Sequence, residues 1–334
     1  MTHVARTVAF KPGERNIFFH ILTACNLACR HCYINPAQHG SDTLALATIQ
    51  RWLELFVAPG KTGNVIFLGG EPTLHPGLAA AVAHAKMLGF GVTVDSNGYL
   101  FHDFLHRIDP ELLDYLSFSL DGPDPEINDP LRGSGVFATC VANIKKAVAL
   151  GFRTSLIYTV SSRNLLHLER MAPLLVELGV RKFFIQVIGL RGRSAGPAVG
   201  DHVLQVSRDK WLAVVPEVAA RAAAHGIQVT YPKVFLDRDE IFQCAGRVAE
   251  NYFIFPNGRV YQCPLCEDHP INAWRIEDDE LVKNEGLRED RLFTLDIPEG
   301  CVMNKLLQPD TIDYDADGRP RHRISCCLLK QEIG

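Results

Sequence analysis

The chain has 334 residues, 47% of them hydrophobic, and a formal net charge of −4 at pH 7. This length can bury the cores of one large and one smaller domain, and the charge offers no basic surface for nucleic acid. No apolar run is long enough to span a membrane, and residues 1–16 lack the apolar core of a signal peptide. We therefore expect a cytoplasmic protein without nucleic-acid or membrane partners, in which clustered cysteines bind metal rather than form disulfides.

Short apolar strands alternate with amphipathic helical segments, a pattern typical of parallel β-α units. The predicted strands span residues 16–22, 64–68, 91–94, 115–120, 153–160 and 182–187. The predicted helices span residues 41–57, 77–88, 136–150 and 164–178, with a further helix from about residue 101. Ser41 or Asp42 is expected to cap the first helix. These units occupy residues 16–230, after an N-terminal arm of residues 1–15.

The first predicted strand leads into three cysteines, Cys25, Cys29 and Cys32, in C-x3-C-x2-C spacing with Tyr33 directly after them. Three thiolates leave one iron of a 4Fe-4S cluster without a protein ligand, so that a small molecule can bind there. A cluster built for electron transfer is usually closed by four cysteines. A zinc site is the alternative that the spacing allows.

Three further motifs follow predicted strands: Gly69-Gly70-Glu71-Pro72, Asp95-Ser96-Asn97-Gly98 and Ser119-Leu120-Asp121-Gly122-Pro123. Together with the cysteine triplet, and in the same order, these motifs resemble those of the radical S-adenosylmethionine (SAM) enzymes over roughly residues 16–230. The resemblance implies an α/β fold, a (β/α)6 partial TIM barrel. In parallel α/β sheets, ligands bind beyond the carboxyl ends of the strands, which is where these motifs lie.

The resemblance implies that the cysteine triplet holds a SAM-binding 4Fe-4S cluster. Reduced by a one-electron donor such as flavodoxin or ferredoxin, the cluster would cleave SAM to a 5′-deoxyadenosyl radical that abstracts hydrogen from a substrate. The residues that the resemblance assigns to SAM binding are Tyr33, Gly69, Gly70, Glu71, Pro72, Asn97, Ser119 and Arg132. Asp121 is either a further contact or a turn cap, and Arg132 is either a contact or a surface ion pair. Arg191 and Arg193 either approach SAM or substrate or are solvated.

A second cysteine group begins at Cys244. The segment between Cys244 and Cys263 predicts two strands joined by a turn at Pro256-Asn257-Gly258, and Cys266 follows in C-x2-C spacing. This arrangement resembles the SPASM and twitch extensions of radical SAM enzymes, which carry auxiliary 4Fe-4S clusters. We therefore expect an α+β extension of this type over residues 231–334, with a zinc ribbon as the alternative.

The number of cysteines favours one auxiliary cluster. Cys140 lies in a predicted helix, where a buried apolar role is expected. Beyond it and the first triplet, the remaining cysteines are Cys244, Cys263, Cys266, Cys301, Cys326 and Cys327. Two complete clusters need more ligands than these, and the C-x2-C-x5-C-x3-C run of a full SPASM domain is missing. We therefore expect a twitch-like extension whose single auxiliary cluster is bound by Cys244, Cys263, Cys266 and Cys326, with Cys327 and then Cys301 as alternative fourth ligands.

These motifs do not identify the substrate. Peptide-modifying members of the family often carry an N-terminal peptide-binding domain, whereas the first predicted strand here begins at residue 16. We therefore expect a small-molecule substrate, such as a sugar, nucleoside or amino acid derivative that is oxidised, decarboxylated or epimerised. The alternative is a maturase that modifies a ribosomally made peptide or protein, including a short peptide. A non-catalytic iron–sulfur electron carrier is the third hypothesis, although it leaves the Gly-Gly-Glu-Pro motif unexplained.

Overall fold

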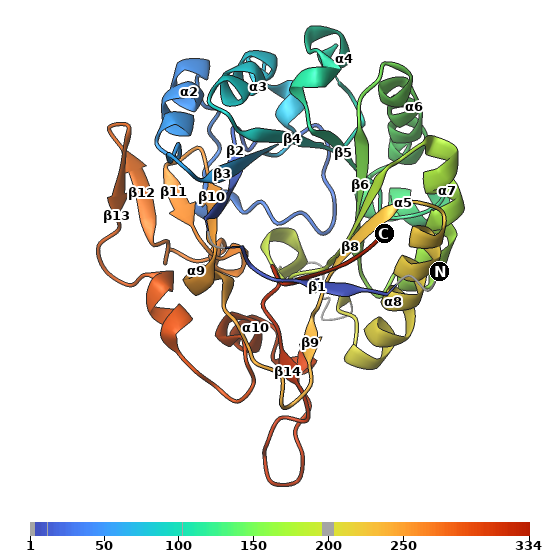
Figure 1. Ribbon diagram of the computed structural model, residues 1–334, viewed down its shortest axis with the longest axis vertical. Helices are drawn as coiled ribbons and strands as arrows, with labels where there is room; N and C mark the ends of the chain where they lie inside the picture. The colour runs from blue at the N-terminus through green and yellow to red at the C-terminus, as the bar shows by residue number, and fades with distance from the viewer. Residues whose placement is uncertain (1–3, 12, 102, 196–203) are drawn as a thin grey trace.

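The computed structural model describes residues 4–11, 13–101, 103–195 and 204–334. Its centre is a curved parallel sheet in which each strand pairs with the next along the chain (Figure 1). The strands are β2 (Glu14–His20), β3 (Thr62–Leu68), β4 (Gly91–Ser96), β5 (Tyr115–Ser119), β6 (Thr154–Val160) and β7 (Lys182–Val187). The predicted (β/α)6 partial barrel is therefore confirmed, and each predicted strand overlaps an observed one.

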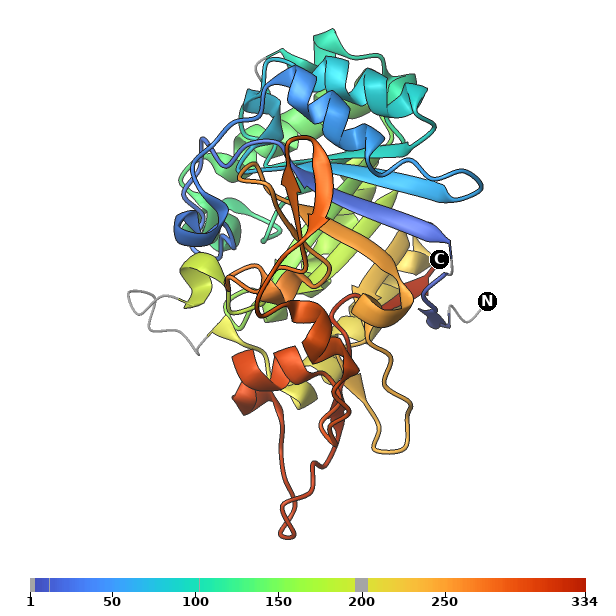
Figure 2. The ribbon, with the colours of Figure 1, turned by 90° about the vertical axis from the view of Figure 1, so that its left-hand side faces the viewer.

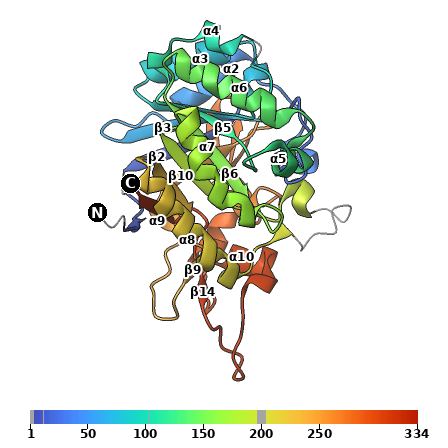
Figure 3. The ribbon, with the colours of Figure 1, turned by 90° about the vertical axis from the view of Figure 1, so that its right-hand side faces the viewer.

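Helices cover the outer face of the barrel (Figures 1 and 3). They are α2 (Leu46–Glu54), α3 (Leu78–Met87), α4 (Phe104–Arg107), α6 (Val136–Ala149), α7 (Met171–Leu178) and α8 (Arg208–Ala224). Their apolar faces and the strands share one core, in which Phe19, Phe67 and Phe118 are fully buried. Strands covered on both faces are apolar along most of their length, which explains the short hydrophobic runs in the sequence.

Shorter elements occupy the connections between strands and helices. They are α1 (Pro36–His39), α5 (Pro125–Arg132), η1 (Pro72–Leu74), η2 (Pro110–Leu112), η3 (Leu165–Arg170) and η4 (Gly192–Ala195), where η denotes a 3-10 helix. No helix in the described part of the chain is long and apolar enough to cross a membrane.

Two helix predictions need correction. The helix expected over residues 41–57 begins at Leu46, and neither Ser41 nor Asp42 caps it. Backbone hydrogen bonds instead hold the chain before Ala45 extended beside the segment that follows β2, with Leu44 donating to Ile21 at 3.0 Å. Side-chain capping was the wrong expectation because this tertiary pairing fixes where the helix begins.

The helix expected over residues 164–178 is divided into η3 and α7. Pro173 lies in the first turn of α7. A proline is tolerated there because the amide N–H groups of the first turn have no partner within the helix, but it cannot continue an α-helix that began earlier.

The sheet extends beyond the six predicted strands on both sides. A seventh parallel strand, β8 (Gln228–Pro232), pairs with β7, followed by antiparallel β15 (Lys330–Ile333) and β1 (Arg6–Val8). The two chain ends therefore lie side by side at this edge (Figure 1). The predicted domain boundary after residue 230 falls inside β8, because the C-terminal segment returns to pair with the barrel.

At the other edge, β10 (Glu250–Ile254) pairs in parallel with β2, followed by β11 (Arg259–Tyr261), β12 (Trp274–Glu277) and β13 (Glu280–Lys283). The predicted hairpin is present: β10 and β11 are antiparallel, and Gly258 in the turn has φ of 81°. The other elements of the C-terminal extension are β9 (Phe235–Leu236), β14 (Arg323–Ile324), α9 (Ala245–Val248), α10 (Val302–Leu307), η6 (Pro264–Cys266), η7 (Glu289–Thr294) and η8 (Pro309–Thr311). Figure 2 shows this α+β extension beside and below the barrel.

Candidate functional site

The first cysteine loop is positioned by the two glycines of the Gly-Gly-Glu-Pro motif. Gly70 N–H donates to the carbonyl of Leu22 at 3.0 Å, and Glu71 N–H donates to that of Ala24 at 2.9 Å. A Cβ on Gly69 would stand 2.5 Å from the carbonyl oxygen of Leu22, and one on Gly70 would overlap the carbonyl oxygens of residues 23 and 24. Glycine is thus required at both positions because the chain approaches the start of the cysteine loop without room for a side chain.

Glu71 is fully buried and connects this motif to the end of β4. Its carboxylate accepts hydrogen bonds from Thr73 N (3.0 Å), Thr73 Oγ1 (2.6 Å), Ser96 Oγ (2.9 Å) and Asn97 N (2.7 Å). Burial raises its pKa, while these donors oppose the rise. Both carboxylate oxygens are used within the protein, so Glu71 organises the motifs that surround the site. Pro72, also buried, opens η1 behind it.

Asn97 lies against the cysteine loop. Its Nδ2 donates to Asn26 Oδ1 at 2.8 Å and lies 3.7 Å from Cys25 Sγ, and its Oδ1 accepts from Tyr99 N at 2.8 Å. The side chain is nevertheless close to the surface of the site, since the neighbouring Cys25 is exposed. Ser119 ends β5 at the same rim and is partly buried.

Cys140 is completely buried in α6, as predicted for a small apolar residue. Its thiol packs behind the rim, within 4.0 Å of the Ser119 carbonyl oxygen. A Cβ on Gly98 would stand 2.6 Å from the same sulfur. Cys140 therefore supports the backbone at the ends of β4 and β5.

A buried ionic cluster lies beneath the cysteine loop. Arg132 Nε is 2.6 Å and His31 Nε2 is 3.0 Å from Asp121 Oδ2, and Asp121 is fully buried. Burial disfavours the carboxylate, but Arg132 and His31 outweigh it and hold the pKa of Asp121 well below its usual range. The surface ion pair considered for Arg132 is thus wrong, because this side chain is only 7% exposed.

The same cluster reaches the cysteines through the backbone. Cys29 Sγ donates to the Arg132 carbonyl at 3.7 Å, and Arg30 N–H donates to that of Leu131 at 2.9 Å. His31 carried no functional signal in the sequence apart from its place between two cysteines. The structure shows that the contact of His31 with Asp121 helps to hold the cysteine loop in place.

The thiols of the first loop lie within electrostatic range of one another. Although Cys25 is exposed at the rim, the protein around its thiol removes part of its hydration, and this desolvation, with the nearby Glu71, Cys29 and Cys32, raises its pKa to about 11. Burial also raises the pKa of Cys29, opposed by Arg132. Thiolates at these positions need positive charge from a metal, and three neighbouring sulfur donors at a strand end fit an iron–sulfur cluster with one open iron.

Tyr33 turns from the cysteine loop toward the C-terminal extension. Its hydroxyl is 2.7 Å from His20 Nε2, and the Arg191 guanidinium lies 5.1 Å above its ring. The His20 ring stacks on Phe255 with centroids 4.0 Å apart. Tyr33 thereby joins the barrel to the strand that follows Cys244.

The loop after β7 contacts both cysteine groups. Arg191 Nη1 donates to Glu267 Oε2 at 2.7 Å and to the Pro264 carbonyl at 2.5 Å, beside the second group. Arg193 N–H donates to the Cys32 carbonyl at 2.8 Å, and Nη1 of its exposed side chain donates to the Cys29 carbonyl at 3.3 Å. Arg191 is therefore bound within the protein, while Arg193 stays at the edge of the first loop.

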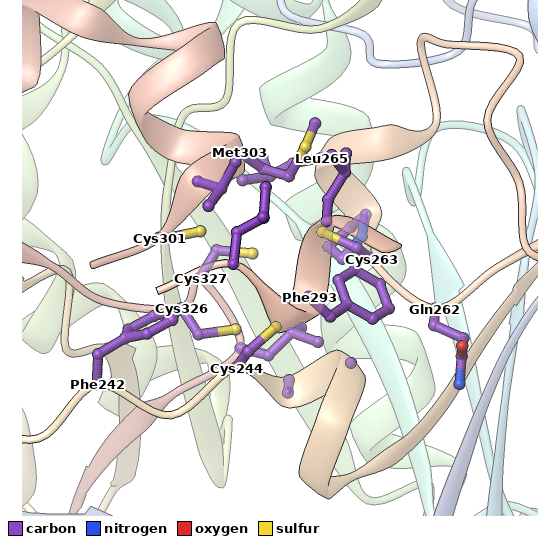
Figure 4. A pocket seen from close by; sticks show the side chains of 17 residues that line it. Phe242, Cys244, Gln262, Cys263, Leu265, Phe293, Cys301, Met303, Cys326 and Cys327 are labelled. Carbon is purple, nitrogen blue, oxygen red and sulfur yellow. The ribbon is translucent and has the colours of Figure 1, made fainter. Parts of the chain in front are cut away.

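The second cysteine group converges on one largely apolar cavity, shown in Figure 4. Five thiols from four chain segments turn toward one another there, those of Cys244, Cys263, Cys301, Cys326 and Cys327. The sequence analysis places Cys301 last among the candidate fourth ligands, because spacing along the chain does not show which distant segments meet. Cys266 is buried beside this group and interacts with the Cys263 thiol, although it is not among the described residues that line the cavity.

The thiols of this cavity have unequal proton affinities. Burial raises the pKa of Cys244 to about 11 and also raises that of Cys301. Cys326 instead accepts a hydrogen bond from Cys327, which lowers its pKa and raises that of Cys327. Cys326 is thus the better thiolate of the adjacent pair. A cluster of soft sulfur donors in an apolar cavity fits an iron–sulfur cluster.

Glu289 supports the second group and was missed by sequence reasoning. It is fully buried, and its carboxylate accepts from Gln262 N at 2.6 Å and Cys263 N at 3.1 Å. Burial raises its pKa to about 8.

Among the residues that the structure describes, no three acidic, histidine or cysteine side chains are placed as ligands of a single metal ion.

Known proteins resemble this chain over its barrel and beyond it. Residues 20–175 match the sequence model of the Radical SAM superfamily. Mycofactocin maturase MftC of Mycobacterium ulcerans (strain Agy99) is 28% identical over 270 residues, which cover 72% of this chain and 66% of that protein. The AdoMet-dependent heme synthase of Oleidesulfovibrio alaskensis is 28% identical over 188 residues, covering 55% of this chain and 48% of the synthase. The chain thus spans less than two thirds of the length of these relatives.

The crystal structure of Streptococcus suis SuiB is similar in fold, with a TM-score of 0.62 at 12% identity over 90% of this chain and 66% of SuiB. SuiB bound to its precursor peptide SuiA gives a TM-score of 0.59 at 13% identity, covering 89% and 65%. At 90% coverage, the shared fold includes much of the C-terminal extension. Over residues 20–175, just under half of the chain, the sequence is similar to the radical SAM superfamily, whose enzymes use SAM and a 4Fe-4S cluster.

Proposed function

We propose that this chain is a maturase that cleaves SAM reductively and uses the resulting radical to modify a peptide. The observation that carries the proposal is the placement of the three-cysteine loop on the barrel rim, beside a second cysteine-lined cavity. A relative aligned over most of this chain is named a maturase, and a protein of similar fold has been solved with a precursor peptide. These similarities favour the peptide alternative over the small-molecule substrate expected from the sequence.

In this proposal, Cys25, Cys29 and Cys32 hold the SAM-binding cluster, which when reduced supplies the electron that breaks the bond between sulfur and C5′ of SAM. The protein's own part is positioning. Gly69 and Gly70 hold the cysteine loop, and Asn97, Ser119 and Arg193 face the rim where SAM would bind. Asp121, Arg132 and His31 fix the loop from below, and a flavodoxin or ferredoxin supplies the electron.

For the auxiliary cluster, we propose Cys244, Cys263 and Cys326 as ligands, with a fourth from Cys266, Cys301 or Cys327. The depressed proton affinity of Cys326 supports its place in this set. The proposed units are a barrel over residues 16–230 and a twitch-like extension over residues 231–334, joined by the shared sheet.

The test is anaerobic reconstitution followed by assay of iron, sulfide and 5′-deoxyadenosine with dithionite and SAM. We expect about eight irons per chain, about four of which are lost in Cys29→Ala together with SAM cleavage. Met87→Ala is the control, since this residue is exposed on α3. Zinc without iron or sulfide, or clusters without SAM cleavage, would contradict the proposal.

The peptide is tested separately. Small peptides encoded beside the gene are incubated with the reconstituted protein, SAM and reductant, and examined by mass spectrometry. A mass change that needs SAM and Cys29 supports a maturase. Modification of a sugar, nucleoside or tetrapyrrole instead, with the peptides unchanged, would return the assignment to small-molecule chemistry.

A further inference from the structure

A second cavity lies beyond the carboxyl ends of β7 and β8, between the barrel and the C-terminal segment. About 70 Å³ of it is accessible to the centre of a water molecule, enough room for several waters or one small ligand group. Its apolar walls include Trp211 and Phe235. Pro264, Leu265 and Cys327 line both this cavity and the cysteine-lined one, so these residues form the wall between the two.

Neutral amides form a row along one wall of this second cavity. Gln205 Nε2 donates to Gln308 Oε1 at 3.0 Å, Gln308 Nε2 lies 3.4 Å from Asn304 Oδ1, and Asn304 Nδ2 donates to the Ser325 carbonyl at 3.0 Å. Each link uses one of the two N–H groups of an amide. These hydrogen bonds therefore fix the orientation of the amide side chains, and the remaining N–H groups and carbonyl lone pairs can bind a ligand.

The hydroxyl of Ser325 lines the same cavity without a partner. Ser325 is 1% exposed, and its Oγ has no hydrogen-bond partner in the part of the chain that the structure describes. Buried polar groups are nearly always paired, so this hydroxyl in the cavity wall is available to a water or to a ligand atom.

The lining of this cavity disfavours charged ligands. Among the described residues that line it, Arg191 alone is charged, and its guanidinium is neutralised by Glu267 at 2.7 Å. A charged ligand entering between Trp211 and Phe235 would lose its hydration without an opposite charge to replace it. An uncharged group with both donors and acceptors would instead match the amide row.

We propose that this cavity binds an uncharged amide-bearing part of the substrate, such as a peptide bond or a carboxamide side chain, next to Cys327. That the ligand is a substrate segment rests on the proposed peptide-modifying function. The binding chemistry itself rests on Gln205, Asn304, Gln308 and Ser325 alone.

The experiment uses Trp211 as the reporter, since the chain has three tryptophans and this one lines the cavity. Holoprotein labelled with 5-fluorotryptophan is reconstituted anaerobically and titrated with N-acetyl-L-alaninamide, followed by ¹⁹F NMR, with Trp211→Phe assigning the signal. We expect a saturable shift of the Trp211 resonance. Zwitterionic alanylalanine should cause at least a fivefold weaker response.

Two variants test the wall. Ser325→Ala and Gln308→Leu should each weaken the amide titration at least fivefold, whereas Gln50→Leu, the same type of change on α2, should leave it unaltered. The inference is overturned if the neutral amide leaves Trp211 unmoved, if the zwitterion binds equally well, or if both wall variants bind like the parent.

SAM cleavage, measured in the same samples, separates this inference from the proposed function. Amide binding without SAM cleavage would contradict the proposed function but support the amide-binding cavity. SAM cleavage with an unchanged Trp211 resonance would support SAM-dependent activity but contradict the amide-binding cavity.

Discussion

The guanidinium of Arg191 lies 2.7 Å from the carboxylate of Glu267 and also over the ring of Tyr33. Tyr33 directly follows Cys32, and Glu267 directly follows Cys266. One side chain thus connects the segments that carry the two cysteine groups, and it fixes their relative position through a pair that is mostly removed from water.

Replacing Arg191 with methionine should therefore destabilise the fold. Glu267 is 2% exposed, and removing one partner of a buried pair costs about 3 kcal/mol because the other charge is left unpaired. Urea unfolding followed by circular dichroism measures the loss. The double variant Arg191→Met, Glu267→Gln should recover part of it, and equal stability of the single variant and the parent would refute this role.

Gly70→Ala should impair the first cysteine loop while sparing the second group. The added Cβ would overlap backbone carbonyl oxygens at the start of the loop, which cannot move as a flexible side chain would. We expect reconstituted iron to fall toward about four per chain and SAM cleavage to fall at least tenfold. Gly334→Ala provides the control because a Cβ there makes only ordinary contacts, the nearest at 3.7 Å. Full iron content in Gly70→Ala would show that the close approach does not matter.

Stability should fall in mild acid because of His20. This side chain is 1% exposed, and burial, with His39 nearby, lowers its pKa to about 3. Below about pH 6.5 the unfolded chain takes up a proton that the folded chain refuses, so stability is complete above that pH and declines below it. One such group contributes a slope of about 1.4 kcal/mol per pH unit.

Urea unfolding at pH 5.5 and 7.5 measures this slope. His20→Phe preserves a ring to stack on Phe255 but removes the titrating nitrogen atoms, so its slope should be smaller than that of the parent. His225→Phe, a change at an exposed position after α8, should leave the slope unaltered. An unchanged slope in His20→Phe would assign the acid sensitivity to other groups.

Cys326 and Cys327 should differ in their effect on the auxiliary cluster. Since Cys326 has the lower proton affinity of the pair, Cys326→Ala should lose about four irons, whereas Cys327→Ala should retain them. Iron and sulfide analysis with Mössbauer spectroscopy distinguishes the two. The opposite pattern would make Cys327 the ligand.

Local sequence patterns were enough to predict the strands of the parallel sheet and to place the first cysteine loop after one of them, and the resemblance of the motifs implied the barrel. Each strand of the parallel sheet is a short apolar run, and each rim motif directly follows its strand, so spacing along the chain already implies proximity in space. The hairpin around Gly258 was predictable for the same reason, because its turn residues are neighbours in sequence.

Long-range pairing decided the rest. The segment before α2 is extended because it pairs with the chain after β2, and Cys301 reaches the cavity of Cys244 only because distant segments fold onto one another. His31 and Glu289 carry no local signal, because their roles come from buried partners on other segments, Asp121 for His31 and the backbone of Gln262 and Cys263 for Glu289. Arg191 was a candidate from the sequence, but nothing local pairs it with Glu267. The sequence by itself determined which chemistry the chain can hold, since that depends on closely spaced thiols. Tertiary structure alone decided how the two cysteine groups and the amide-lined cavity meet, because desolvation and ion pairing act between residues that no sequence spacing brings together.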